Sequence, residues 1–130
     1  MLWIGQVAVV TLPGEIDVNN ADMVREDLLS VLSQDALLLV ADLSKTTFCD
    51  SAGVSALVRT FRRATSTARG MRLVVATPAV QRVLSITGVD RLVEIFPSVA
   101  ASLAGQHGQA GAPPSQSATA RADTDGGGAA

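Results

Sequence analysis

The sequence is poor in the side chains that most enzyme sites need. Its only histidine, His107, falls in a C-terminal stretch without core-forming residues, so residues 1–104 cannot supply a Ser-His-Asp or Cys-His site. Its only cysteine, Cys49, cannot form an intramolecular disulfide, and without a histidine nearby it cannot assemble a zinc site. There is also no Walker-type Gly-Lys-Ser motif and no dinucleotide fingerprint. The sequence therefore predicts no enzyme, no metal site and no cofactor.

Long apolar runs and an excess of positive charge are also missing. The longest apolar run, residues 36–41, is too short to cross a bilayer, and the start lacks the cationic leader of a signal peptide. A formal net charge of −2 gives no general attraction to nucleic acid or to anionic lipid. We expect a cytoplasmic protein that contacts neither directly. In such a chain the basic residues between 59 and 72 indicate a solvated helix face: Arg59, Arg62, Arg63, Arg69 and Arg72.

What the sequence does contain is enough aliphatic material for one core. It is 48% hydrophobic and 17% charged, as in globular domains, but only 3% aromatic, so Val, Leu, Ile, Ala and Met must form the core. From Gly105 onward there is no Val, Leu, Ile, Met, Phe or Trp. Such a stretch cannot bury enough apolar surface to offset its ordering entropy. We therefore expect a domain over residues 1–104 and a disordered tail over 105–130.

Two periodicities alternate within residues 1–104. Short apolar runs typical of strands occur at 7–12, 37–41, 73–76 and 93–96, and residues 1–4 allow an extra edge strand. Helical spacing connects them at 20–32, from about 52 to before Gly70, from Pro78 to Gly88, and from Ser98 to Leu103. Asn20 and Thr77 stand where the first and third helices need N-caps. This alternation predicts an α/β fold, with helices packed against a mostly parallel β-sheet.

Two polar loops follow consecutive strands of this predicted sheet. One contains Asp50 and Ser51 at the start of the second helix, where unpaired N–H groups favour negative charge. The other contains Asp17. Because loops at the carboxyl ends of parallel strands gather at one edge, Asp17 and Ser51 could share a surface. The simpler interpretation remains open: Asp50 or Ser51 only caps the helix, and Asp17 only forms a turn.

The chain resembles the STAS domain, in particular the bacterial anti-sigma factor antagonist family. The resemblance covers nearly all of residues 5–100 and rests on three motifs in the right order. They are Gly-Glu-Ile-Asp at 14–17 with Ala21 and Leu28, Phe-Cys-Asp-Ser-Ala-Gly-Val at 48–54, and Pro-Ala-Val-Gln-Arg-Val-Leu at 78–84 with Gly88.

This resemblance implies a function that switches by phosphorylation. In the family, the serine after the aspartate, here Ser51, is phosphorylated by the partner, a serine kinase that is itself the anti-sigma factor. The unphosphorylated antagonist binds that kinase and frees the sigma factor, and a PP2C-type phosphatase reverses the modification. The implied partner-binding residues are Glu15, Asp17, Asp50, Ser51, Ala52 and Gly53. The alternative is a STAS scaffold or small-ligand sensor without a kinase partner.

One departure from the family pattern concerns the modified loop. Many members have Ser-Ser-Gly where this chain has Ser51, Ala52 and Gly53. Ser51 is therefore the only serine of this loop that a kinase could modify.

The composition of the C-terminal stretch leads to a first prediction. Truncation after Ala104 should leave the melting temperature nearly unchanged, because residues 105–130 offer no apolar side chains to the core. Thermal unfolding of the full and truncated chains, followed by circular dichroism, tests this. A drop of more than a few degrees would show that the stretch docks onto the domain.

Overall fold

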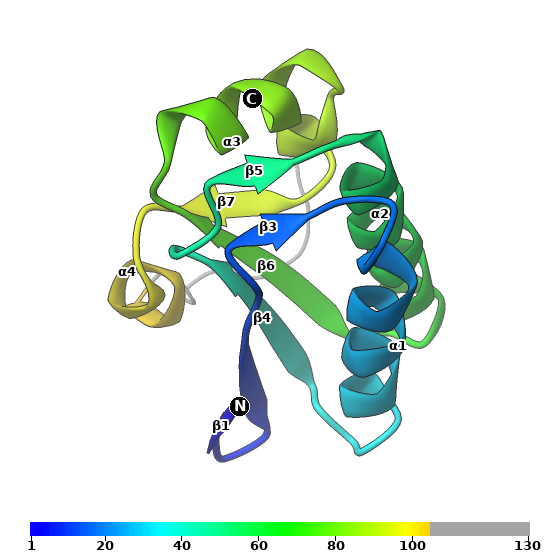
Figure 1. The fold of residues 1–130 in the computed structure, drawn as a ribbon. Helices are drawn as coiled ribbons and strands as arrows, with labels where there is room; N and C mark the ends of the chain where they lie inside the picture. The colour runs from blue at the N-terminus through cyan, green and yellow to red at the C-terminus, as the bar shows by residue number, and fades with distance from the viewer. Residues whose placement is uncertain (105–130) are drawn as a thin grey trace. The chain divides into compact units, whose positions relative to one another are not determined.

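In the computed structural model, which describes residues 1–104, the short apolar runs form one five-stranded sheet (Figure 1). The sheet is parallel except at its first edge, where residues 2–4 run antiparallel to their neighbour. This confirms the predicted α/β class. In spatial order the strands are β1 (Leu2–Ile4), β2 (Val7–Thr11), β4 (Leu38–Leu43), β6 (Gly70–Val75) and β7 (Glu94–Phe96). The predicted tail, 105–130, lies outside the described residues.

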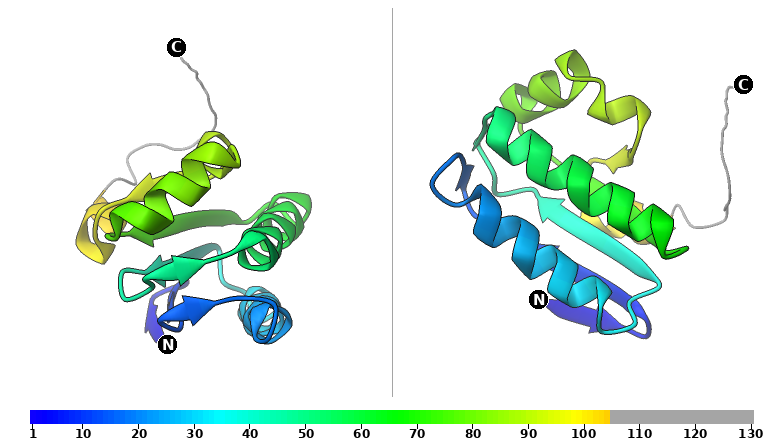
Figure 2. Two further views of the ribbon diagram at one scale, coloured as in Figure 1. Left: turned by 45° about the horizontal axis from the view of Figure 1, so that its top comes forward. Right: turned by 90° about the vertical axis from the view of Figure 1, so that its right-hand side faces the viewer.

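Helices α1 (Ala21–Leu32) and α2 (Ser51–Ser66) lie side by side against the same face of this sheet (Figure 2). Each has one buried stripe, as the 3.6-residue period requires. The stripe of α1 is Ala21, Val24, Leu28, Val31 and Leu32, and that of α2 is Gly53, Val54, Ala56, Leu57, Thr60 and Ala64. The sheet contributes a matching layer of side chains to this core, including Ala8, Leu39, Ala41, Leu43, Met71, Leu73 and Val75.

The remaining helices follow β6 and β7. Helix α3 (Pro78–Ile86) begins with proline in its first turn and is followed by Gly88, whose φ of 83° lies in the left-handed region. A 3-10 turn, η1 (Val89–Arg91), then leads into β7, and α4 (Val99–Ala104) is the last described element. The predicted stop at Gly88 is therefore confirmed.

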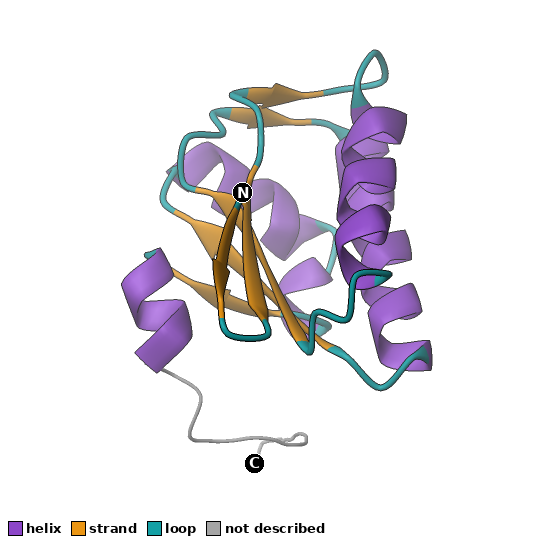
Figure 3. Cartoon of the chain, turned by 90° about the horizontal axis from the view of Figure 1, so that it is seen from below, coloured by secondary structure: helices purple, strands orange, loops and turns teal. Residues whose placement is uncertain are grey.

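A second, two-stranded sheet was not predicted from the sequence. It pairs β3 (Glu15–Ile16) with β5 (Phe48–Cys49) in parallel, separate from the main sheet (Figure 3). Strands of two residues are too short to show a hydrophobic periodicity, so the sequence predicted loops for both segments. Their pairing determines where the two polar loops lie.

Both predicted N-cap residues occupy their positions without capping through their side chains. Asn20 precedes α1, but its Oδ1 accepts from the backbone N–H of Asp17 at 2.9 Å and its Nδ2 donates to the carbonyl of Glu15 at 2.8 Å. Thr77 precedes α3, and its hydroxyl donates to the carbonyl of Thr46 at 2.8 Å. The Asn20 side chain therefore bonds within the preceding turn and the Thr77 side chain bonds to a distant loop, and neither bonds to the helix N–H groups.

Two further expectations need correction. The central strand begins at Leu38 rather than Leu37, and the Leu37 side chain is 55% exposed. Arg69 and Arg72 are not part of a solvated helix face. Arg69 lies beyond the end of α2 at Ser66, and its Nη1 donates to the carbonyl of Ala36 at 2.6 Å. Arg72 lies in β6 and is only 8% exposed. Its Nε donates to Glu94 at 3.3 Å, and its guanidinium lies 5.4 Å from the centroid of the Phe96 ring. Burial of this arginine is thus accompanied by an ion pair and a cation–π contact.

The central strand β4 provides the second prediction. Leu39 is fully buried between β2 and β6, so Leu39→Ala should lower the free energy of unfolding by about 2–5 kcal/mol through lost burial and a residual cavity. Leu37→Ala is the matched control, since the same side chain is removed from an exposed position two residues away. Denaturant titration should separate the two variants, and equal losses would contradict the observed register.

Candidate functional site

The two polar loops are joined by a short backbone ladder. The N–H of Thr47 donates to the carbonyl of Gly14 at 2.8 Å, and the N–H of Asp50 donates to the carbonyl of Ile16 at 3.1 Å. Between them, Glu15 pairs with Phe48 and Ile16 with Cys49. Segments more than 30 residues apart in sequence are thereby fixed side by side, each leading into a helix (Figure 1).

Side chains alternate across this ladder. Ile16 and Cys49 point into the core, whereas Glu15 and Phe48 are exposed. Burial, and to a lesser degree the neighbouring Asp50 carboxylate, raises the pKa of the Cys49 thiol to about 11. The thiol is therefore protonated at neutral pH and unreactive, as expected for a small buried apolar group.

Hydrogen bonds from two threonine hydroxyls connect the segment before α3 to the two loops joined by the ladder. Thr46 is fully buried, and its hydroxyl donates to the carbonyl of Pro13 at 2.8 Å. The carbonyl of Thr46 in turn accepts from the hydroxyl of Thr77, which stands before α3. The residues that follow β2, β4 and β6 are thus connected at the carboxyl edge of the sheet, where the sequence placed its polar loops.

The start of α2 settles which residue caps this helix. Asp50 has extended backbone geometry, and its Oδ1 accepts from the N–H groups of Ala52 at 2.9 Å and Gly53 at 3.1 Å. Asp50 is therefore the N-cap. Ser51 is the first helical residue, and its side chain is exposed and makes no capping bond. The capping role therefore belongs to Asp50 and not to Ser51.

Asp17 is placed beside this helix start by the ladder. Its Oδ1 accepts from the N–H of Asn19 at 2.9 Å, and its carbonyl accepts from the N–H groups of Asn20 and Ala21. Asp17 thus has the turn-forming role that the sequence left open. Asp17 is partly exposed and directly follows β3, which pairs with β5, the strand that Asp50 follows.

Gly53 allows the first turn of α2 to approach the ladder closely. A Cβ built on Gly53 would lie 2.6 Å from Sγ of Cys49 and 2.9 Å from Cγ2 of Ile16. A side chain at this position would have to displace the side chains of Cys49 and Ile16. Gly53 therefore has a packing role, and direct contact between Gly53 and a partner stays a prediction.

The solvent-facing residues of the ladder and of the two loops that follow it form what we call the loop surface: Glu15, Asp17, Phe48, Asp50 and Ser51. It presents a hydroxyl, three carboxylates and a phenyl ring. Within residues 1–104 there is no cluster of three or more His, Cys, Asp or Glu side chains that could hold a metal ion. The one hydroxyl of this surface, that of Ser51, belongs to an exposed residue.

Comparison with known proteins identifies the family of this chain. A profile of the STAS domain matches residues 3–102. The chain belongs to the STAS domain family.

Relatives of this STAS protein include regulatory members. It is 30% identical over 86 residues to the anti-sigma-B factor antagonist of Bacillus subtilis, a match that covers 66% of this chain and 78% of the relative. An anti-sigma factor antagonist from Mycobacterium paratuberculosis has the same fold, with a TM-score of 0.74 and 28% identity over 79% of this chain and 87% of the other. These relatives confirm the prediction that the chain is not an enzyme.

The STAS fold also occurs outside this regulatory group. A sulfate transporter family protein from Wolinella succinogenes superimposes with a TM-score of 0.69 and 17% identity, covering 80% of this chain and 87% of the other. At 17% identity this match shows only that the two chains share a fold. Within residues 1–104, none of the STAS protein's helices is long and apolar enough to span a membrane.

Phe48 is the member of the loop surface that the sequence analysis did not assign to the partner-binding set. Its signal was present, because it stands inside the second motif next to Cys49. The exposed side of a two-residue strand cannot be distinguished from the buried side until the pairing is known.

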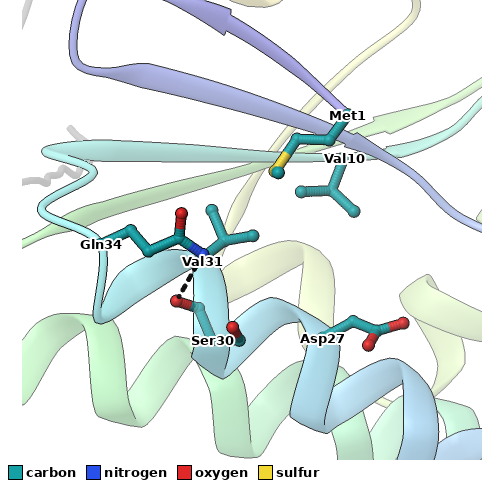
Figure 4. Close-up of a pocket in the computed structure, with 6 residues that line it drawn as sticks. All are labelled: Met1, Val10, Asp27, Ser30, Val31 and Gln34. Carbon is teal, nitrogen blue, oxygen red and sulfur yellow. Dashed lines mark hydrogen bonds between the residues drawn. The ribbon is translucent and has the colours of Figure 1, made fainter.

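A cavity of about 260 Å³ lies elsewhere on the STAS domain, between α1 and the edge of the main sheet (Figure 4). It is lined by Met1, Val10, Asp27, Ser30, Val31 and Gln34. It contains no residue of the loop surface and no basic side chain. The cavity and the loop surface are thus separate features.

The close approach at Gly53 gives the third prediction. Gly53→Ala should destabilise the domain by about 1 kcal/mol or more, because overpacking against two strands outweighs the gain in helix propensity. The control is Gly14→Ala, whose Cβ would have an ordinary contact of 3.7 Å with the Lys45 carbonyl. Adding Cys49→Ala to Gly53→Ala should recover part of the loss in a double-mutant cycle. Additive losses would argue against the clash.

Proposed function

We propose that this STAS protein is an anti-sigma factor antagonist controlled at Ser51. The unphosphorylated chain binds an anti-sigma factor that is also a serine kinase, and the sigma factor is released. Phosphorylation of Ser51 by that kinase ends the binding, and a PP2C-type phosphatase restores it. The cytoplasm is the compartment in which these partners meet.

One observation carries this proposal: Ser51 is exposed at the first position of α2, while Asp50 does the capping. A serine that capped the helix would be engaged with backbone N–H groups and poorly available to a kinase. The Ser51 hydroxyl makes no such capping bond. The relationship to an anti-sigma-B factor antagonist supports the choice of partner class.

The electrostatics of the loop surface explain how the modification would act. A phosphoryl group adds about −1.5 to −2 charges at neutral pH. The N–H groups of Ala52 and Gly53, which would otherwise neutralise it, already donate to Asp50. The new charge would therefore face outward among the carboxylates of Asp17 and Asp50. Desolvating it at an interface costs several kcal/mol, and on the order of 4 kcal/mol is a thousandfold in affinity.

The same geometry explains why the modification need not unfold the domain. Negative charge at the start of a helix is favourable by about 0.3–1 kcal/mol. The capping bonds of Asp50 and the ladder between β3 and β5 do not involve the Ser51 hydroxyl. The change would thus be confined to the surface that the partner contacts.

The fourth prediction separates the switch from stability. Ser51→Ala should bind the cognate anti-sigma factor kinase as wild type does, take up no phosphate from ATP, and change the free energy of unfolding little, since Ser51 is not the cap. Ser51→Asp should fold normally and bind weakly, because its carboxylate mimics part of the phosphate charge. Calorimetric titration with the purified kinase, with radiolabelled ATP for phosphate transfer, measures both.

Asp50→Ala is the matched structural control. It should lower the free energy of unfolding by about 0.5–2 kcal/mol through loss of the cap. A folded Ser51→Asp variant that binds as tightly as wild type, together with phosphate entering Ser51→Ala, would contradict the switch. A wild-type chain that binds no such kinase would favour a STAS scaffold or small-ligand sensor.

A further inference from the structure

Phe48 is a large apolar side chain held in an exposed position beside the proposed phosphorylation site. It is 50% exposed, although the next residue, Cys49, is buried. It stands three residues before Ser51 and is paired with Glu15 on the neighbouring strand. The phenyl ring thus belongs to the same surface as the hydroxyl and the carboxylates.

The backbone around Phe48 is fixed before any partner arrives. The N–H groups on either side of its short strand, those of Thr47 and Asp50, both donate to the neighbouring strand. Thr46, one residue further back, is fully buried and bonded to Pro13. Little conformational entropy remains to be lost at this position, which makes the ring a pre-organised contact.

The carboxylates around the ring have no cationic partner of their own. Within residues 1–104 no lysine or arginine forms an ion pair with Glu15, Asp17 or Asp50. An apolar ring rimmed by unpaired carboxylates is complementary to an apolar pocket rimmed by lysine or arginine. A nucleic acid, which is itself an anion, does not fit this surface.

We propose that Phe48 is the apolar anchor of the interface with the anti-sigma factor kinase, inserting into a pocket of that partner whose rim is basic. This inference rests on the proposed function and adds to it the residue that supplies much of the affinity. Central aromatic side chains ringed by polar groups are the usual hot spots of protein interfaces. The carboxylates then orient the partner, and Ser51 lies at the edge of the contact.

In this arrangement the carboxylates and the phenyl ring contribute to binding through different interactions. Contacts of the carboxylates with a basic rim weaken as salt rises, whereas burial of the phenyl ring is nearly independent of salt. Phosphate on Ser51 opposes binding through the charged part. The loss caused by removing Phe48 should therefore persist at high salt, and the loss caused by Glu15→Gln should shrink.

The experiment compares wild type, Phe48→Ala, Phe48→Thr, Glu15→Gln and Leu37→Ala in calorimetric titrations with the purified cognate kinase at low and high salt. Both Phe48 variants should bind about thirtyfold more weakly or worse at either salt concentration, the size expected of a hot-spot truncation. Phe48→Thr keeps a strand-forming residue and serves if the alanine variant unfolds. Leu37→Ala removes an equally exposed side chain, and we expect it to bind within about twofold of wild type.

Three results would overturn the inference. If wild type binds the kinase and the folded Phe48 variants bind equally well, Phe48 is not the anchor while the proposed function stands. If wild type binds no kinase, the proposed function and the anchor both fail. If wild type sediments as a dimer that Phe48→Thr dissociates without affecting kinase binding, the ring contacts a second copy of this chain instead.

Discussion

The loop surface of this protein depends on a parallel backbone ladder between two segments of two residues each. The bonds from Thr47 to Gly14 and from Asp50 to Ile16 join loops that follow different strands of the main sheet. Such a short pair cannot be stable alone, because few bonds oppose the entropy of ordering two loops. It persists because Ile16 and Cys49 are buried beneath it and the first turn of α2 packs against them.

Gly53 connects that ladder to the helix that carries the proposed switch. The absence of a side chain lets α2 begin close to Cys49 and Ile16, so its first turn is held by the core rather than by a flexible loop. Asp50 then accepts from the N–H groups of Ala52 and Gly53, which have no partner within the helix. The neighbouring Ser51 needs no structural partner, and its hydroxyl faces solvent. Packing, capping and the proposed regulation thus fall to adjacent residues with little overlap.

Part of this organisation was predictable because it depends on local pattern. The helical spacing of Val24, Leu28 and Val31 and the apolar run of β4 indicated which faces are buried. What the sequence did not predict is the partners of polar side chains that can bond to several groups. Asn20 bonds to groups of the preceding turn, whereas Thr77 and Arg72 bond to groups far away in the sequence. Sequence spacing carries no information about which of several possible partners is nearer.

The sequence by itself determined the alternation of strands and helices, the identity of the motifs and the presence of one serine in the second loop. These follow from residue type and spacing, which act within one or two turns of the chain. Only the tertiary structure decided that Asp50 rather than Ser51 caps α2, that Asp17 lies beside it, and that Phe48 is exposed. Each of these depends on the register between residues 15–16 and 48–49. A slip of one position would exchange the buried and exposed sides of that ladder.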